Sequence, residues 1–201
     1  MGREVVLVPG LWMPGAAMRL LAARISRAGY KSRIFSYRGR SPLEANVERL
    51  ARFAAGSPVH FIGHSLGGLV ILETLNRHSE VSALSVLLLG APVRGCFAGR
   101  RFGGSRAGRW MMGACRPLWE EREANWRRAT PLGVIAGTRA LGLGRAFGPL
   151  PGENDGVVCV SETTVDGMAA RALVPQGHSM LIVSGQVGRL VERFLASASF
   201  E

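Results

Sequence analysis

The stretch of the chain that decides its fold is Val59-His60-Phe61-Ile62-Gly63-His64-Ser65-Leu66-Gly67-Gly68. Residues 59–62 form a short apolar run, which predicts a strand, and apolar residues then recur at helical spacing over 66–78. Between them, Ser65 stands in the pattern Gly-x-Ser-x-Gly. A sharp strand-to-helix turn of this kind strains the serine backbone and exposes its hydroxyl above the sheet. We therefore predict that Ser65 is a nucleophile, the alternative being an ordinary capping serine at a glycine-rich helix start.

On both sides of this turn, apolar runs alternate with helical patterns. This alternation is typical of a parallel α/β sheet with helices on both faces. We expect a trimmed, mostly parallel sheet of about six strands, at 5–8, 32–37, 59–62, 84–89, 134–136 and near 172–174. Helices are expected from Pro14 towards Gly29, from 41 to 54, over 66–78 and at the C-terminal end. The second of them begins with Ser41-Pro42-Leu43-Glu44, which has the pattern of a capping box.

The composition excludes a disordered chain and suits a single domain over residues 1–201. The 201 residues are 47% hydrophobic and 19% charged, which supplies a well-buried core. No apolar run approaches the ~20 residues of a membrane-spanning helix, and the first apolar run is too short for a secretion signal. The three cysteines (Cys96, Cys115 and Cys159) have no paired spacing, so we expect reduced thiols, no zinc site and a cytoplasmic protein.

A nucleophilic serine needs a base to take its proton and an acid to orient that base. After such a turn the chain order is serine, acid, histidine. His60 and His64 precede Ser65, and His78 ends the helix that Ser65 begins. Only His178 follows the later strands, so it is the predicted base.

Aspartate is scarce, and this narrows the choice of acid. The chain has only Asp155 and Asp166. Asp155 lies in a turn-rich loop before Val157-Val158 and 23 residues ahead of His178, where the acid loop belongs. Asp166 precedes a glycine and suits a simple turn, and Glu153 is a weaker third option. We predict Asp155.

The loop after the first strand is expected to complete the site. An oxyanion hole needs two backbone N–H groups, and we predict those of Leu66, directly after the nucleophile, and Leu11. Leu11 belongs to the run Pro9-Gly10-Leu11-Trp12-Met13-Pro14. Trp12 and Met13 would then line an acyl-sized pocket, although core packing is an equally simple interpretation of both.

Five motifs together make the chain resemble small bacterial serine esterases and lipases of the α/β-hydrolase superfamily. They are Leu7-Val8-Pro9-Gly10, the stretch 63–68, Leu89-Gly90-Ala91-Pro92, Asn154-Asp155-Gly156-Val157-Val158 and Gly177-His178-Ser179. The resemblance implies a triad of Ser65, His178 and Asp155, with Leu11 and Leu66 as oxyanion donors. It covers nearly the whole chain.

The chain departs from these relatives at two points. Such lipases usually have His-Gly where this sequence has Pro9-Gly10. Some of them also hold a structural calcium ion through aspartates, and with two aspartates here, one of them assigned, we expect no metal site. The expected hydrolase needs no cofactor.

The net charge of +11 is concentrated in one segment, residues 92–130, called here the cap segment. It holds nine arginines, three glutamates and three of the four tryptophans, and we expect a small cap inserted in the fold. It could be a solvated face, a contact with an anionic membrane surface, or a dock for an acidic acyl carrier protein. Nucleic-acid binding is the least favoured reading of the charge.

The sequence therefore predicts a serine hydrolase that cleaves small-molecule or lipid acyl esters through an acyl-enzyme on Ser65. One alternative is an acyltransferase or thioesterase with the same triad. Another, of a different class, is a non-catalytic hydrolase-like scaffold that binds an anionic partner or membrane surface. The cytoplasmic location would then include peripheral membrane contact.

Overall fold

The computed structural model describes residues 3–142 and 148–201 and contains one six-stranded sheet. All five strand pairs are parallel, and the strand order is β2-β1-β3-β4-β5-β6. The strands are β1 Glu4–Val8, β2 Lys31–Ile34, β3 Val59–His64, β4 Ala83–Leu89, β5 Leu132–Gly137 and β6 Ala170–Val174. The predicted α/β sheet of about six strands is thus confirmed, and it is entirely rather than mostly parallel.

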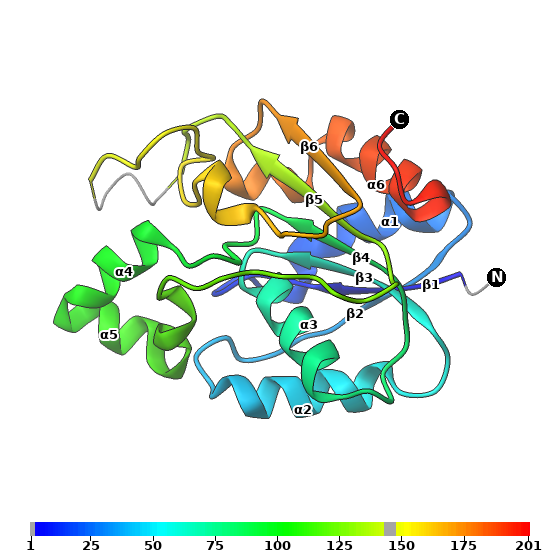
Figure 1. Ribbon diagram of the computed structural model, residues 1–201, viewed down its shortest axis with the longest axis horizontal. Coiled ribbons are helices and arrows are strands. Elements are labelled where there is room, and N and C mark those ends of the chain that lie inside the picture. The colour runs from blue at the N-terminus through cyan, green and yellow to red at the C-terminus, as the bar shows by residue number, and fades with distance from the viewer. Residues whose placement is uncertain (1–2, 143–147) are drawn as a thin grey trace.

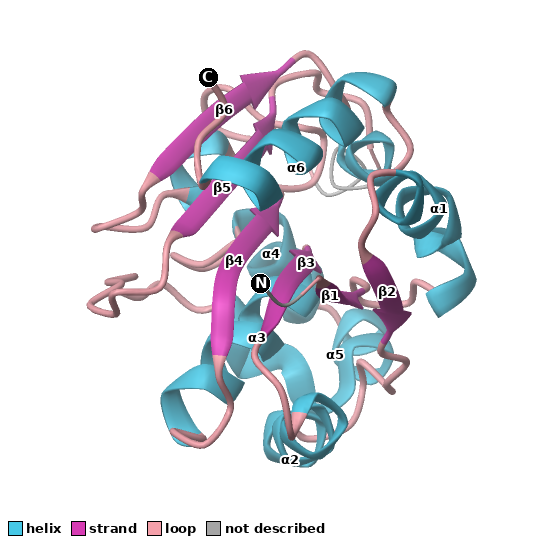
Figure 2. Ribbon diagram, turned by 90° about the vertical axis from the view of Figure 1, so that its right-hand side faces the viewer, coloured by secondary structure: helices cyan, strands magenta, loops and turns pink. Residues whose placement is uncertain are grey.

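Helices cover both faces of the sheet, as Figure 2 shows. They are α1 Arg19–Arg27, α2 Leu43–Ala54, α3 Leu66–Arg77, α4 Phe97–Gly104, α5 Arg106–Met112 and α6 Gly185–Ser197. Val6 and Val8 face a core shared with α2 and α3, whereas Val5 and Leu7 face a core shared with α1 and α6. Successive residues of a strand point to opposite faces, so a strand buried on both faces is apolar throughout. This is why continuous apolar runs identified the inner strands β1, β3, β4 and β5, whereas the edge strands β2 and β6 are partly exposed.

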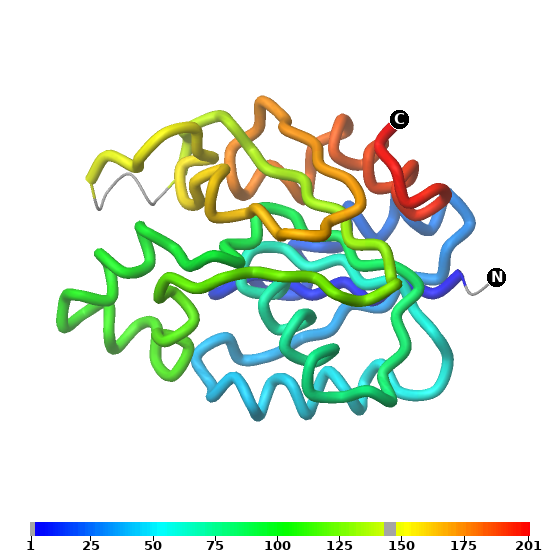
Figure 3. Tube along the Cα trace, in the orientation of Figure 1, coloured from blue at the N-terminus to red at the C-terminus, as the bar shows by residue number. Residues whose placement is uncertain are grey.

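The cap segment emerges at the carboxyl ends of the strands. Its helices α4 and α5, followed by the 3₁₀ helix η2 (Gly113–Trp119), project from the left end of the molecule in Figure 1. The start of β1 and the C-terminal residues lie at the opposite end (Figure 3). The charge-rich part of the sequence is therefore placed at the same edge of the sheet as the turn that carries Ser65.

Local details differ from the sequence-based expectations. The prediction of a capping box at 41–44 is wrong. Pro42 is the N-terminal capping residue of α2, and no side chain forms a capping hydrogen bond with that helix. The second strand ends at Ile34 rather than at 37, because the chain leaves the sheet as it turns towards α2. The first helix is preceded by a 3₁₀ turn at Gly15–Met18, so its α-helical part begins at Arg19.

None of the helices formed by residues 3–142 and 148–201 has the length and apolar character needed to span a bilayer. In the same residues, no three His, Cys, Asp or Glu side chains are arranged to hold a metal ion. The three cysteines are buried and form no disulfide.

Candidate active site

Ser65 forms the turn between β3 and α3 in a strained backbone conformation. Its φ and ψ are 53° and −125°, where a residue with a side chain is rarely found. The turn requires glycine at 67, because a Cβ there would lie 2.2 Å from the carbonyl oxygen of Val8 in β1. Gly63 and Gly68 also meet closely, with 2.6 Å between a Cβ built on Gly63 and Cα of Gly68. The glycines therefore allow α3 to begin in close contact with the sheet, and Ser65 is the residue of the turn that adopts the strained backbone conformation.

Asp155 and His178 form a buried pair. Asp155 Oδ2 lies 2.7 Å from His178 Nδ1, and only 1% of Asp155 is exposed. The other carboxylate oxygen accepts hydrogen bonds from the backbone N–H groups of Val157 (3.0 Å) and Val158 (2.7 Å). Because a carboxylate oxygen accepts hydrogen bonds, Nδ1 of His178 carries the proton and donates it to Asp155. Nε2 is then left as the ring atom able to accept a proton.

The two members of this pair come from different strand ends. Asp155 lies in the segment between β5 and β6, and His178 begins the 3₁₀ helix that follows β6. A backbone bond from the N–H of His178 to the carbonyl of Asp155 (2.9 Å) ties the segments together. Gly90 gives them room, since a Cβ at this position would lie 3.1 Å from Asp155 Oδ2 and 3.2 Å from His178 Nδ1. The motif around Gly90 signalled this position, but sequence reasoning gave it no part in the site.

Ser65 and His178 line one cavity of about 210 Å³. Both residues are largely buried, with 9% and 7% of their surface exposed. No hydrogen bond of 3.5 Å or less joins Ser65 to His178 in the described part of the chain. Such bonds are often long in the absence of substrate and tighten in the reacting complex. The structure thus brings all three predicted triad residues to one edge of the sheet.

The residues set aside on sequence grounds lie elsewhere. The Asp166 side chain is 61% exposed and pairs with Arg94 at 2.7 Å. Glu153 is exposed. His78 lies at the surface beside Glu48 and Glu80. These placements leave Asp155 as the aspartate that contacts a histidine.

The loop after β1 borders the same cavity. Leu11, Trp12 and Met13 line it, and Leu66 begins α3 directly after Ser65. Trp12 has a positive φ of 58° and is 52% exposed, so it is a rim residue rather than part of the core. Its ring meets Phe102 of α4 edge-on, with 5.8 Å between the ring centroids.

Tyr37 holds this loop, a role that sequence reasoning missed. Its hydroxyl donates a hydrogen bond of 2.8 Å to the carbonyl of Pro9. Burial raises the pKa of the Tyr37 hydroxyl far above its usual value, so the group remains a donor. The Pro9-Gly10 departure from the related lipases is therefore accompanied by a side-chain anchor from the neighbouring loop.

His64 is a second missed residue, because its position before Ser65 in the chain argued against a role as base. Its Nε2 lies 3.1 Å from the carbonyl oxygen of His178, which can only accept, so Nε2 carries the proton. The rings of the two histidines are 4.7 Å apart. Burial, and then the charge of His178, lower the pKa of His64 to about 3. A neutral His64 thus supports the backbone of His178 and adds no charge beside it.

The cap segment supplies the opposite wall of the cavity. This wall is formed by Cys96, Ala98, Gly99, Phe102, Met112 and Trp119. Burial raises the pKa of the Cys96 thiol to about 12, so the sulfur is protonated and is a weak nucleophile. The wall is thus mainly apolar and contributes no second nucleophile.

A parallel sheet with a strained serine after β3 and an Asp–His pair after later strands defines the class of α/β hydrolases. The family model for the alpha/beta hydrolase family matches residues 5–193, and the chain belongs to this family. No curated protein matches it by sequence.

Several solved structures share the fold. The mature lipase BlEst2 of Bacillus licheniformis is 16% identical, with a TM-score of 0.71 over 97% of this chain and 91% of that one. A pyrethroid hydrolase of Sphingobium faniae is 14% identical, with a TM-score of 0.65 over 98% of each chain. A bromoperoxidase of Bacillus anthracis is also 14% identical, with a TM-score of 0.66 over 98% and 93%. These three proteins are named for different activities, so the shared fold does not by itself identify the reaction.

Proposed function

We propose that this hydrolase cleaves carboxylic esters through an acyl-enzyme formed on Ser65. The observation that carries the proposal is that the strained Ser65 shares one cavity with His178, whose Nδ1 is held 2.7 Å from buried Asp155. Ser65 supplies the nucleophile, His178 the base, and Asp155 the fixed orientation of that base. The names of two structural neighbours, a lipase and a pyrethroid hydrolase, add support.

In the first half of the reaction, Nε2 of His178 takes the Ser65 proton as Oγ attacks the ester carbonyl. The imidazolium ion that forms lies against the Asp155 carboxylate, which stabilises it and stays ionised. The tetrahedral oxyanion would be held by the N–H groups of Leu66 and Leu11, near the start of α3, where the helix dipole favours negative charge. His178 then returns the proton to the leaving alcohol.

In the second half, water enters and His178 removes its proton, so that hydroxide attacks the acyl-enzyme. The acid is released and Ser65 recovers its proton from His178. The same steps with a different acceptor in place of water would transfer the acyl group. The apolar walls formed by Phe102, Met112 and Trp119 suit an acyl chain.

The test is a pair of serine variants at the same cavity. Ser65→Ala is expected to abolish turnover of p-nitrophenyl esters and covalent labelling by a fluorophosphonate. Ser179 also lines the cavity, so Ser179→Ala is the matched control and should keep both. Labelling that survives Ser65→Ala, or wild-type protein that neither labels nor turns over ester, would overturn the proposal, and the second result would favour a non-catalytic scaffold.

A substrate panel separates the ester hydrolase from its nearest alternatives. We expect p-nitrophenyl acyl esters to be cleaved faster than acyl-thioesters of equal chain length. Faster turnover of the thioesters would identify a thioesterase. Product esters formed in the presence of added alcohol, at the expense of free acid, would identify an acyltransferase.

A further inference from the structure

The part of the cap segment that forms α4, α5 and η2 is rich in arginine, and the three glutamates of the cap segment (Glu120, Glu121 and Glu123) follow it. No aspartate or glutamate occurs between residues 97 and 119. Six exposed arginines in or beside this part form no ion pair with any residue in 3–142 or 148–201: Arg38, Arg40, Arg101, Arg106, Arg109 and Arg116. By contrast, Arg100 pairs with Glu121 at 2.7 Å. Together with the exposed apolar residues described next, these six arginines form what we call the basic end.

Large apolar side chains are exposed among these arginines. Trp110 is 70% exposed, Trp12 52% and Met111 37%. The two tryptophans have fixed contacts: Trp12 Nε1 donates to the carbonyl of Met111 at 3.2 Å, and Arg40 donates to the carbonyl of Trp110 at 2.7 Å. The guanidinium of Arg40 also lies over the Trp110 ring, 4.7 Å from its centroid. Exposed apolar groups of this size, fixed in position, mark an interaction surface.

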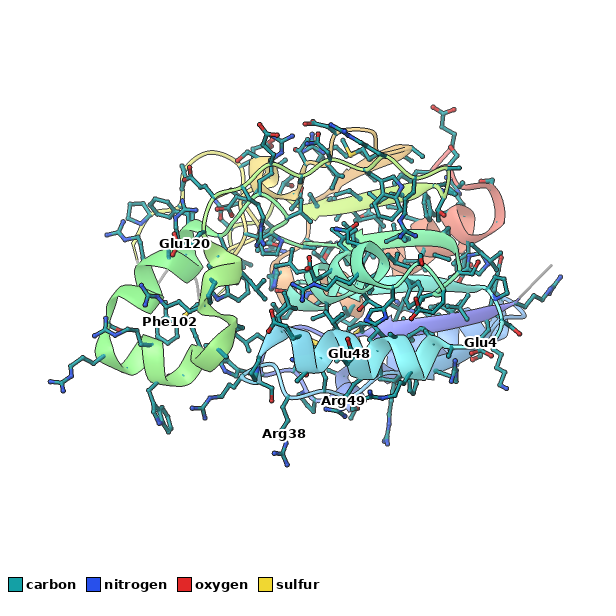
Figure 4. All side chains as sticks on the ribbon, turned by 60° about the horizontal axis from the view of Figure 1, so that its bottom comes forward. Glu4, Arg38, Glu48, Arg49, Phe102 and Glu120 are labelled. Atoms are coloured by element: carbon teal, nitrogen blue, oxygen red, sulfur yellow. The ribbon has the colours of Figure 1, made fainter. Side chains whose placement is uncertain are left out.

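The basic end adjoins the cavity at Trp12, which also lines a neighbouring surface depression together with Arg38 and Arg40. Trp12 lines that cavity, and two further exposed apolar residues, Leu141 (54%) and Met180 (48%), adjoin lining residues in sequence. The helices α4 and α5 form the projecting end in Figure 1, and in Figure 4 Arg38 extends away from the body of the protein while Phe102 lies among the cap helices. A partner that covers Trp12 at the basic end would therefore lie beside the cavity.

We propose that the basic end docks onto the surface of an anionic lipid bilayer. Arginine suits negatively charged headgroups, and tryptophan suits the boundary between headgroups and acyl chains. A second copy of the chain would be repelled by the same positive charge. A nucleic acid or an acidic protein would satisfy the arginines, but a bilayer also buries Trp110, Met111 and Trp12.

The docking surface stands on observations separate from the catalytic proposal. If the ester hydrolase proposed above is correct, the docked orientation turns the Ser65 cavity towards the membrane. Lipid esters would then be the substrate class that this site meets. A protein without ester hydrolase activity would still bind the bilayer through the same residues.

The experiment is co-sedimentation with vesicles of phosphatidylcholine alone or with about one-third phosphatidylglycerol. Wild-type protein and Ser65→Ala are expected to bind the anionic vesicles equally, and to release them at high salt. Arg106→Gln with Arg109→Gln should weaken binding about ten- to thirtyfold, and Trp110→Ala several-fold. The matched control, Arg27→Gln with Arg189→Gln, removes the same charge from exposed positions on α1 and α6.

Thermal unfolding verifies that each variant is folded, which is expected for the arginine and tryptophan variants because their side chains are exposed. Equal binding to anionic and neutral vesicles, or none to either, would overturn the proposal. So would an equal loss in the control pair, since net charge alone would then explain binding. Binding to an acidic acyl carrier protein or to duplex DNA without vesicle binding would assign the basic end to that partner instead. Failure of Ser65→Ala to lose ester turnover would concern the catalytic proposal alone.

Discussion

The two walls of the cavity are built in different ways. At the sheet edge, the loops that carry Ser65, Asp155 and His178 are fixed by backbone hydrogen bonds and by close contacts of glycines with neighbouring main chain. The cap wall presents side chains such as Phe102 and Met112, on short helices. Bond-making requires accurately placed atoms, and the backbone contacts of the first wall suit that requirement. The second sets the shape and polarity of the space.

This contrast indicates where the molecule tolerates change. Positions fixed by backbone contact leave no room for an added atom, whereas side chains that fill a pocket can be exchanged for others of similar size. The sheet-edge wall should therefore govern whether the reaction occurs. The cap wall should govern which acyl groups enter.

The largest expected effect on activity comes from removing the hydrogen bond between Asp155 and His178 while keeping the shape of the sheet-edge wall. Asp155→Asn keeps an oxygen to accept the N–H groups of Val157 and Val158 but places an amide against His178. The wrong histidine tautomer should then lower kcat about 10⁴-fold. The rates of p-nitrophenyl acetate hydrolysis give the measurement.

Asp166→Asn is the matched control for this variant, since Asp166 is the other aspartate and lies at the surface. It is expected to leave kcat unchanged. A loss of activity in Asp166→Asn, with Asp155→Asn active, would reverse the assignment of the acid.

A glycine pair measures the packing difference directly. Gly67→Ala brings a Cβ to 2.2 Å from the Val8 carbonyl oxygen and 2.5 Å from that of Pro9, both backbone atoms. We expect it to lower the free energy of unfolding by about 3 kcal/mol. Gly104, at the end of α4, has no atom within 4 Å of an added Cβ. Gly104→Ala should raise stability by about 0.5 kcal/mol or leave it unchanged.

Urea unfolding of both alanine variants provides these values. Similar losses in the two would mean that the cap helices are packed as tightly as the turn at Ser65. The contrast between the two walls would then fail.

Glu162 joins the two walls. Its carboxylate accepts the N–H of Phe97, at the start of α4, at 2.5 Å and the N–H of Cys159 at 2.8 Å. Burial raises the pKa of this carboxyl. Glu162→Ala leaves both donors without their partner and should lower the free energy of unfolding by about 2 kcal/mol.

The control for Glu162 is Glu120→Ala, an exposed cap-segment carboxylate labelled in Figure 4, which should change stability by less than about 0.5 kcal/mol. Chemical unfolding of the two variants is compared with the wild type. Equal stabilities of Glu162→Ala and the wild type would show that the carboxylate does not hold the cap to the sheet edge.

The smallest expected effect, taken per pH unit, is a pH dependence at His64. Its pKa in the folded protein is about 3, below its usual value, so the unfolded chain binds the proton first as the pH falls. Stability from this group is present above about pH 6.5 and is lost towards pH 3, by at most about 1.4 kcal/mol per pH unit. His64→Gln should therefore lose less stability than the wild type over this range.

Unfolding free energies at several pH values provide the comparison. His78→Gln serves as the control, because His78 is a surface residue whose pKa is raised rather than lowered, first by its hydrogen bond to Glu80. It should retain the pH dependence due to His64. A pH dependence unchanged in His64→Gln would show that the buried ring does not oppose its own protonation.

The fold was accessible from the sequence because its signals are local. Continuous apolar runs mark strands buried on both faces, and the two-residue period that sorts Val5 from Val6 follows from backbone geometry. The capping box at 41–44 failed because a Ser-Pro-Leu-Glu pattern permits a cap hydrogen bond without requiring one. The predicted end of the second strand at residue 37 was also wrong, because the chain turns towards α2 after Ile34.

Sequence patterns were enough to predict the order of Ser65, Asp155 and His178 along the chain and the need for glycine at 67. The glycine belongs to a local motif, and the order of the three residues follows the order of the strands in this class of sheet. The contact of His64 with His178, the anchoring of Pro9 by Tyr37, and the exposure of Trp110 beside the burial of Trp119 became known only from the three-dimensional structure. These are contacts between segments distant in sequence, or exposures set by how short helices dock. Composition and spacing carry no information about such distances, because many packings satisfy the same local pattern.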